Sequence, residues 1–373
     1  MSHQPFVDLK GQWAEVQAEL LPEIGEIMAV GSFIGGQRVD RFETAFASFC
    51  GAAHCVGVAN GTDALHLALR AAGVEPGDEV ITVPNTFVAT VEAIRQCGAR
   101  PVLVDVHPDT LLMDPQRLDS ARTGRTRVVI PVHLYGLLAD MEAIGGWSAR
   151  TGIALVEDAA QAHGARRGGC TAGGFGLAAG ISFYPSKNLG AAGDAGAVVT
   201  SDAKIADRVR LLRNHGEGER YVHDVEGYNS RLDTLQAAVL MAKLARLADW
   251  NARRRALAAV YRSRLGSVTG VELLAAPRDP DSHVYHLFVV RCARRAALRE
   301  ALAAAGIATG IHYPVAVHLQ PAYHGLGYGP GSFPVAEAAA REVLSLPIYP
   351  HMTDAQVHRV CDAIEMFLER GAA

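Results

Sequence analysis

Long apolar runs are missing from this sequence. No stretch of apolar residues reaches the roughly 20 residues that a membrane-spanning helix needs. The first residues, MSHQPFVDLKGQWAEV, carry Asp8, Lys10 and Glu15 where a secretory signal would need an unbroken apolar core. The sequence therefore predicts a protein without a membrane span, and we expect it in the cytoplasm.

Clustered positive charge and metal-ligand spacings are missing too. The formal net charge is −4 over 373 residues, and the lysines and arginines form no dense cluster that would indicate a nucleic-acid partner. Six scattered cysteines show no C-x-x-C spacing, and the histidines lack the companions of a compact metal site. We expect reduced, mostly buried thiols, no metal, and small-molecule chemistry.

What is present is the composition of an ordinary α/β protein, with 49% hydrophobic and 20% charged residues. Several short runs between residues 54 and 202 are apolar on both faces, which is typical of parallel strands covered by helices. The string TDALHLALRAAG predicts a helix with Thr62 and Asp63 as capping candidates. Seven strands are predicted, in HCVGVAN, DEVITVP, ARPVLVDV, TRVVIPVHL, IALVEDAA, ISFYPS and GAVVTSD.

A different pattern begins after Gly227. A long helical stretch is followed by a strand in HVYHLFVVR, a helix in AALREALAAAG, a strand leading into GIHYPV, and a last helix near TDAQVHRVCDAIEMFLERG. The sequence therefore predicts a large α/β domain over residues 1–245, which includes an N-terminal helix, and a small α+β domain over residues 246–373. A cleft between two such domains is the default place for a site.

Two adjacent acids, Glu157 and Asp158, stand in the run IALVEDAA. Side chains alternate along a strand, so these two point to opposite faces and only one can serve a given site. An isolated acid here would be an ordinary loop anchor. Parallel sheets, however, bind ligands beyond the carboxyl ends of their strands, where this pair is predicted to lie.

Lys187 lies in the loop of ISFYPSKNLGAAGDAGAVVT. A loop lysine is normally a solvated surface charge, but this one follows a strand whose Ser182 and Tyr184 share a face, and it precedes Gly190. A desolvated lysine loses proton affinity and can form a Schiff base with an aldehyde cofactor. Pyridoxal phosphate, the typical cofactor, also needs a carboxylate at its pyridinium nitrogen, for which Asp158 is the candidate.

A phosphate site is predicted at the start of ANGTDALHLAL. Gly61 permits close approach, and the N–H groups of Gly61 and Thr62 open a helix whose dipole favours an anion, although any capped helix start shares this pattern. The hydroxyl of Ser182 would complete the site. Phe87 in PNTFVAT could stack on a cofactor ring, whereas a lone phenylalanine after a strand more commonly belongs to the core.

These strings together resemble the DegT/StrS-type (DegT/DnrJ/StrS) sugar aminotransferases, which are pyridoxal-phosphate enzymes of fold type I, the aspartate aminotransferase-like fold. The resemblance runs from FVDLKGQ to VLSLPIYP and implies a large, mostly parallel seven-stranded sheet domain with a small C-terminal α+β domain. It rests on ANGTDAL, PNTFVAT, VEDAAQAHGA, SFYPSKNLGAAGDAGAVVT, LRNHG, GYNSRLDTLQAAVL and GIHYPVAVHLQPAY.

The resemblance implies a role for each matching residue. Lys187 would be the Schiff-base lysine and proton carrier, and Asp158 would pair with the pyridinium nitrogen. Asn229 would reach the cofactor phosphate from the neighbouring subunit of a homodimer with shared active sites. The other cofactor contacts would be Gly61, Thr62, Phe87, Gln161 and Ser182, and the sugar pocket would be lined by Tyr184, His312 and Tyr313.

The implied reaction transfers an amino group from glutamate to a nucleotide-linked keto sugar in amino-sugar biosynthesis. The strings RNHG, HVYHLFVVR and HYPVAVHLQPAY look most like members that act at C3 of a dTDP-3-keto-6-deoxyhexose. Members that act at C4, on 3-keto uronates or on cyclitols share most of these strings and stay alternatives, as does glutamine as donor. A dehydratase branch has histidine in place of the Schiff-base lysine, so Lys187 argues against it. A non-catalytic metabolite sensor would need an appendage, whereas the two-domain enzyme accounts for all 373 residues.

Overall fold

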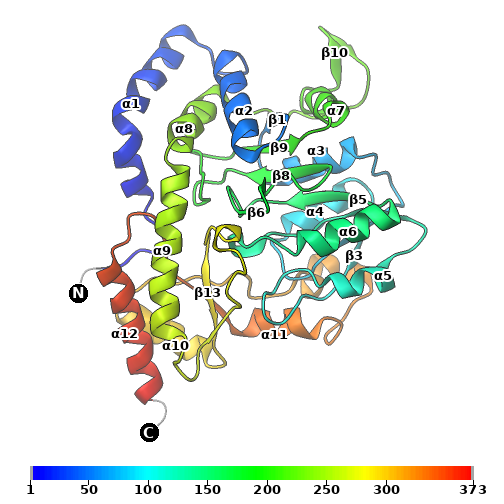
Figure 1. The fold of residues 1–373 in the computed structure, drawn as a ribbon. Helices are drawn as coiled ribbons and strands as arrows, with labels where there is room; N and C mark the ends of the chain where they lie inside the picture. The colour runs from blue at the N-terminus through cyan, green and yellow to red at the C-terminus, as the bar shows by residue number, and fades with distance from the viewer. Residues whose placement is uncertain (1–2, 371–373) are drawn as a thin grey trace.

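The computed structural model describes residues 3–370 (Figure 1). Two helices open the chain, α1 (Leu9–Val30) and α2 (Gln37–Cys50). The side chain of Asp8 caps α1 by accepting a hydrogen bond from the N–H of Gly11 at 3.0 Å. Within residues 3–370, no helix combines the length and the apolar character that crossing a bilayer would take. The cytoplasmic location stays a prediction.

A seven-stranded sheet forms the centre of the large N-terminal part. All seven predicted runs contribute a strand, and every neighbouring pair is parallel except the two that involve β9. The predicted mostly parallel sheet is thus confirmed. In spatial order the strands are β1 (His54–Val58), β9 (Gly196–Thr200), β8 (Ala178–Ser182), β5 (Ala154–Asp158), β4 (Thr126–Val129), β2 (Glu79–Thr82) and β3 (Arg100–Leu103).

Helices cover both faces of this sheet because its strands are apolar on both sides. On one face, Val198 packs in a cluster with α3 (Gly61–Ala71), α4 (Ala89–Gln96) and α7 (Ala203–Arg213). On the other face, the adjacent Val199 packs with α2 and α8 (Thr234–Leu244). Further along that second face, α6 (Met141–Thr151) and side chains of the C-terminal part share one core with β4 and β5.

The C-terminal part is built on the long helix α9 (Leu247–Leu265) and a small antiparallel sheet. The sheet has the order β12 (Glu272–Leu273), β13 (Phe288–Arg291) and β14 (Val343–Leu346), with α10 (Arg295–Ala304), α11 (Pro334–Glu342) and α12 (Asp354–Arg370) around it. Helix α8 ends at Leu244 and α9 begins at Leu247. The division into domains 1–245 and 246–373 stays a prediction.

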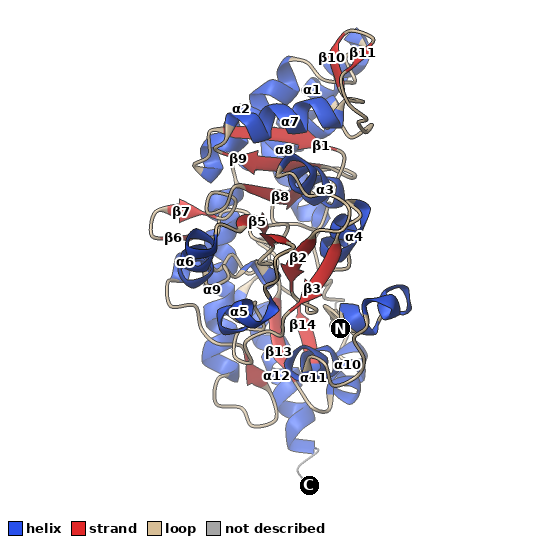
Figure 2. Cartoon of the chain, turned by 90° about the vertical axis from the view of Figure 1, so that its right-hand side faces the viewer, coloured by secondary structure: helices blue, strands red, loops and turns tan. Residues whose placement is uncertain are grey.

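Short elements complete the chain. The hairpin of β10 and β11 projects at the end of the molecule opposite to α12 (Figure 2). These elements are α5 (Leu118–Ala121), the strand pairs β6 (Arg166–Arg167) with β7 (Cys170–Thr171) and β10 (Glu217–Glu219) with β11 (Val222–His223), and the 3-10 turns η1 (Pro115–Arg117), η2 (Leu134–Gly136), η3 (Pro280–Ser282), η4 (Val317–Leu319) and η5 (Pro321–Leu326).

Two predicted strands of the C-terminal part are wrong in extent or place. Only the last four residues of HVYHLFVVR form a strand, because residues 283–287 turn toward the large sheet, where Val284 N donates to Gly136 O. The segment at GIHYPV is not a strand, although Gly310 forms an isolated bridge with Ser345. The strands that pair with β13 are instead β12 and β14, and β14 pairs with it through Val343–Leu346.

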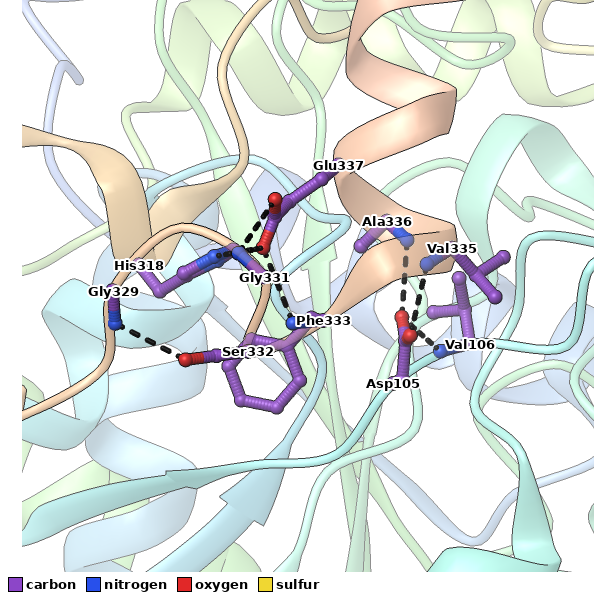
Figure 3. A network of polar contacts seen from close by, with 10 residues as sticks. All are labelled: Asp105, Val106, His318, Gly329, Gly331, Ser332, Phe333, Val335, Ala336 and Glu337. Atoms are coloured by element: carbon purple, nitrogen blue, oxygen red, sulfur yellow. Dashed lines mark hydrogen bonds and ion pairs between the residues drawn. The ribbon is translucent and has the colours of Figure 1, made fainter.

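A polar network fixes residues 318–337 to the end of β3 in the large sheet (Figure 3). The carboxylate of Asp105, just after β3, accepts hydrogen bonds from the N–H groups of Val335 and Ala336, both at 3.0 Å, and so caps α11 from outside. Glu337 in α11 accepts from the N–H of Gly331 at 2.8 Å and contacts His318 Nε2 at 3.1 Å. The chain between residues 318 and 337 is therefore held beside the edge of the large sheet.

Candidate functional site

A cavity of about 690 Å³ opens at the carboxyl ends of the parallel strands, the edge where such sheets bind ligands. The C-terminal part closes one side through His286, His312 and Tyr313. Asn229 is exposed and lies outside the lining of the cavity in its own chain. The other ten predicted site residues all line it: Gly61, Thr62, Phe87, Asp158, Gln161, Ser182, Tyr184, Lys187, His312 and Tyr313.

Lys187 is half-buried in a turn after β8, where its N–H donates to Tyr184 O at 2.8 Å. Loss of hydration in the cavity lowers the pKa of Lys187 to about 8, and the carboxylate of Asp158 opposes that shift. At pH 7 a lysine of this pKa is neutral in roughly a tenth of the molecules. Lys187 is therefore not the solvated surface charge that a loop lysine ordinarily is.

Asp158 ends β5 with only 6% of its surface exposed. Its Oδ2 accepts a hydrogen bond from the hydroxyl of Thr90 at 2.7 Å, and its Oδ1 accepts from the N–H of Ala160 at 3.2 Å. Burial raises the pKa of Asp158, while these two hydrogen bonds and the charge of Lys187 pull it down. A buried carboxylate in this state favours a cationic partner, because the cation replaces the hydration that burial removed.

Glu157 faces away from the cavity, as strand alternation predicts. Its carboxylate is fully buried and contacts His133 Nε2 at 3.0 Å. Three backbone N–H groups from residues 173–176 also donate to it, at 2.8 to 2.9 Å. Glu157 is therefore a loop anchor, and the glycine-rich string GGFG supplies its donors.

The first turn of α3 borders the cavity opposite Ser182. Asn60 caps this helix by accepting from the N–H of Asp63 at 2.8 Å, so the expectation of a cap at Thr62 or Asp63 is wrong. Asp63 instead accepts from Ser230 Oγ at 2.6 Å. The first N–H groups of a helix have no intrahelical partner and attract anions. A Cβ at Gly61 would lie 2.6 Å from Ser182 Cβ, so only glycine keeps helix and strand this close.

Aromatic and amide groups line the wall of the cavity. The side chain of Phe87 is 53% exposed, so the alternative that it belongs to the core is wrong, and its ring centroid lies 5.5 Å from that of Tyr313. Gln161 Nε2 donates to the hydroxyl of Tyr313 at 3.2 Å, and its Oε1 accepts from Tyr135 N at 2.6 Å. Gln161 thus connects Tyr313 in the cavity lining to the backbone of Tyr135, which lies outside that lining.

His312 is held from behind by residues distant in sequence. Its Nδ1 lies 2.8 Å from Ser345 Oγ, and its ring stacks on Phe6 with centroids 5.8 Å apart. The hydroxyl of Tyr135 donates to its backbone oxygen at 2.7 Å. Burial and the charge of Lys187 lower the pKa of His312 to about 4, which keeps the imidazole neutral near pH 7.

The sequence reasoning missed several residues at this site. Thr90, which holds Asp158, stands in the string PNTFVAT, and the only signal for it was its place in that string. His286 lines the cavity but was assigned to a strand of the C-terminal domain. Asp194 also lines the cavity, from the turn before β9. Each of these depends on contacts between segments far apart in sequence.

The residues of the cavity fit pyridoxal phosphate. The start of α3 with Ser182 suits its phosphate, the buried carboxylate of Asp158 suits its cationic ring nitrogen, and the partly neutral Lys187 suits its aldehyde. The absence of a side chain at Gly61 lets the start of α3 and Ser182 approach closely enough to contact one phosphate group together. All three chemical requirements of one cofactor thus meet in one cavity.

Comparisons with known proteins agree with this arrangement. The model of the DegT/DnrJ/EryC1/StrS aminotransferase family matches residues 14–365. A relative from Streptomyces venezuelae, a dTDP-3-amino-3,4,6-trideoxy-alpha-D-glucose transaminase, is 49% identical over 366 residues, which cover 98% of this chain and 96% of the relative.

Two solved structures share the fold over nearly the whole chain. The X-ray structure of S. venezuelae DesV in complex with a ketimine intermediate has a TM-score of 0.96 and 49% identity, and the match covers 99% of this chain and 100% of that one. The crystal structure of NtdA from Bacillus subtilis with bound cofactor PMP has a TM-score of 0.90 and 30% identity, and covers 99% and 86%. The predicted fold class is confirmed.

Proposed function

This chain belongs to the DegT/DnrJ/EryC1/StrS aminotransferase family, and on that premise we propose that it transfers the amino group of glutamate to C3 of a dTDP-linked 3-keto-6-deoxyhexose. It is a pyridoxal-phosphate-dependent aminotransferase of nucleotide sugars. The observation that carries the site assignment is the meeting of Lys187, Asp158 and the start of α3 in one cavity. The S. venezuelae relative, whose name specifies a dTDP sugar with its amino group at C3, supports the choice of carbon.

The predicted residues that line the cavity each have a role in this proposal. When bound, pyridoxal phosphate supplies an aldehyde that bonds amines and a ring that draws electrons from the adjacent carbon. Lys187 Nζ holds the cofactor, and Asp158 keeps a proton on the ring nitrogen. The N–H groups of Gly61 and Thr62 bind the phosphate together with Ser182 Oγ. Phe87 and Gln161 contact the ring, and Tyr184, His312 and Tyr313 line the sugar pocket.

Proton transfer is assigned to Lys187 Nζ. When free, the Lys187 amine would take up the proton from the donor carbon that carries the amino group, and its ammonium form would then give that proton up again. A general base works best when its pKa lies near the operating pH. The pKa of about 8 that burial produces at Lys187 meets this condition, whereas an ordinary lysine remains protonated.

We propose a homodimer with two shared active sites. The described lining of the cavity includes Asp63, Asp158 and Asp194 but only one lysine and no arginine, while the cofactor phosphate, the nucleotide diphosphate and glutamate are all anionic. Hydrogen-bond donors from a second copy would add to those of this chain, and the exposed side chain of Asn229, which follows the β10–β11 hairpin in the sequence, is the one that we assign to the phosphate of the neighbouring subunit. Apolar side chains exposed near the end of α1 offer a face for association: Leu21, Met28, Val30, Phe33 and Ile34.

Borohydride reduction tests the role of Lys187. The reagent fixes the cofactor permanently to the lysine that holds it, so peptide mapping of the reduced enzyme should recover the cofactor on Lys187. Recovery on another lysine, or no labelled peptide from enzyme that contains cofactor, would contradict the assignment. Turnover should then be measured with glutamate and glutamine against dTDP-linked 3-keto and 4-keto sugars, and a preference for a 4-keto sugar would refute the proposed carbon.

Hybrid dimers test the shared site. Lys187→Ala subunits and Asn229→Ala subunits should each be impaired, but mixing them forms hybrids in which one of the two sites has both residues intact. We expect activity to reappear on mixing, up to about half of the wild-type value per hybrid, because only one of the two sites in each hybrid dimer has both residues. Mixtures that exchange subunits, as shown by mass, yet recover no activity would contradict the shared site.

A further inference from the structure

The residue after Lys187, Asn188, links the loop of that lysine to two other parts of the chain. Its side chain is almost fully buried. Its Nδ2 donates to Asn251 Oδ1 on α9 at 2.8 Å and to the backbone oxygen of Val284 at 3.0 Å, and its Oδ1 lies 3.2 Å from His286 Nδ1. His286 lines the same cavity as Lys187.

Each of the two side-chain amides, those of Asn188 and Asn251, faces a backbone oxygen. Because such an oxygen only accepts hydrogen bonds, the NH₂ end of each amide must point toward it. Asn251 Nδ2 donates to His163 O at 2.8 Å, so its Oδ1 is the end that faces Asn188. Asn188 Nδ2 likewise faces Val284 O, so its Oδ1 is the end that faces His286. Since an amide oxygen accepts only, the hydrogen between Asn188 and His286 belongs to His286 Nδ1.

A neutral histidine protonated at Nδ1 has a bare lone pair at Nε2. Within the described part of the chain, no group donates to His286 Nε2. Burial lowers the pKa of His286 well below its ordinary value, and the charges of Lys187 and Arg254 act in the same direction. The imidazole therefore stays neutral near pH 7. Since His286 lines the cavity, the free lone pair at its Nε2 is the acceptor that this side chain can offer to a ligand there.

We propose that His286 Nε2 accepts a hydrogen bond from a hydroxyl group of the keto sugar, and that Asn188 is the positioning residue that sets this tautomer. This inference rests on the proposed function. A lone pair suits a hydroxyl donor and repels a carboxylate, so the contact favours the sugar over the glutamate side chain in the same cavity. Asn188 also couples the sugar contact to the loop that carries Lys187.

Two substitutions at His286 separate the tether from the acceptor. His286→Asn can still reach Asn188 but is too short to present an acceptor where Nε2 lies, whereas the longer His286→Gln can present its amide oxygen there. We expect His286→Asn to raise KM for the keto sugar about tenfold with kcat and the KM for glutamate within twofold, since the contact exists before and during the reaction. His286→Gln should recover most of that loss. The matched control is His324→Asn, an exposed histidine outside the cavity lining.

The outcomes distinguish this inference from the proposed function. If the wild-type enzyme aminates no keto sugar, the proposed function fails before any variant is compared. If the wild type is active and His286→Asn leaves KM for the sugar within twofold, or raises KM for glutamate instead, the inference is overturned. Should His286→Asn not fold, ¹⁵N NMR of histidine-labelled wild-type holoenzyme decides. A proton on Nδ1 of His286 supports the inference, and a proton on Nε2 overturns it.

Discussion

Among the acids in the described lining of the cavity, Asp158 is the buried one, and replacing it by asparagine removes the charge that we assign to a cationic ring nitrogen. The amide has the same shape, and the hydroxyl of Thr90 at 2.7 Å can still donate to its oxygen. What is lost is the carboxylate that we propose keeps the cofactor ring protonated. Removing one partner of a buried ion pair costs about 3 to 5 kcal/mol. If that loss falls on the transition state, turnover should drop by roughly 2 × 10²- to 5 × 10³-fold.

The assay should separate this loss from unfolding. Stopped-flow absorbance of the cofactor after mixing with glutamate reports the first half reaction, and thermal denaturation reports stability. We expect Asp158→Asn to retain its fold, because a neutral amide is easier to bury than a carboxylate whose pKa burial already raises. The matched control is Asp207→Asn on α7, an exposed acid whose pair with Arg210 at 2.8 Å contributes little.

A milder substitution at Thr90 separates the charge of Asp158 from its hydrogen bond. Thr90→Val removes one hydrogen bond from the carboxylate and keeps the charge, so turnover should fall only about tenfold. Near-wild-type turnover in Asp158→Asn would refute the role of this carboxylate. So would an Asp158→Asn loss no larger than that of Thr90→Val, since the charge would then contribute nothing beyond its hydrogen bond.

Two further predictions concern the lysine and the phosphate site. Burial depresses the pKa of Lys187, so its amine should become reactive as pH rises through about 8, whereas fully solvated lysines ordinarily need a higher pH. Competitive acetylation of the apoenzyme read by mass spectrometry checks this, and equal profiles would contradict it. Gly61→Ala should weaken pyridoxal phosphate binding at least tenfold, because the new Cβ meets Ser182 Cβ at 2.6 Å. Gly25→Ala, where a Cβ meets nothing within 4 Å, is the control, and unchanged cofactor affinity in Gly61→Ala would refute the close approach.

The large sheet could be predicted because its signal is local. Each of its seven strands is a short apolar run bounded by turn residues, and burial on both faces requires that composition whatever the neighbours are. The strands of the C-terminal part were less predictable from the sequence. Residues 310–315 have the composition of a strand, but they lie at the cavity, where His312 contacts Ser345 and Phe6. Together with the hydroxyl of Tyr135, which donates to His312 O, these contacts come from three distant segments and override the local preference there.

In the candidate site too, some residues could be predicted from local patterns and others could not. Lys187, Asp158, Gly61 and Ser182 stand at strand ends and at a helix start, positions that chain order and topology bring to one edge of a sheet. Their chemistry follows from residue type. The helix cap at Asn60 was missed because capping depends on local backbone geometry that several neighbouring polar residues could have supplied.

The chemistry that this chain can perform follows from local features of the sequence: a lysine between a strand and a glycine-rich turn, an acid in the preceding apolar run, and a helix start with glycine. The state of those groups depends instead on tertiary contacts. Burial lowers the pKa of Lys187 and raises that of Asp158, and the protonated nitrogen of His286 follows from amides on two other segments. Hydration and hydrogen-bond partners depend on residues far apart in the chain, so they exist only once the fold brings those residues together.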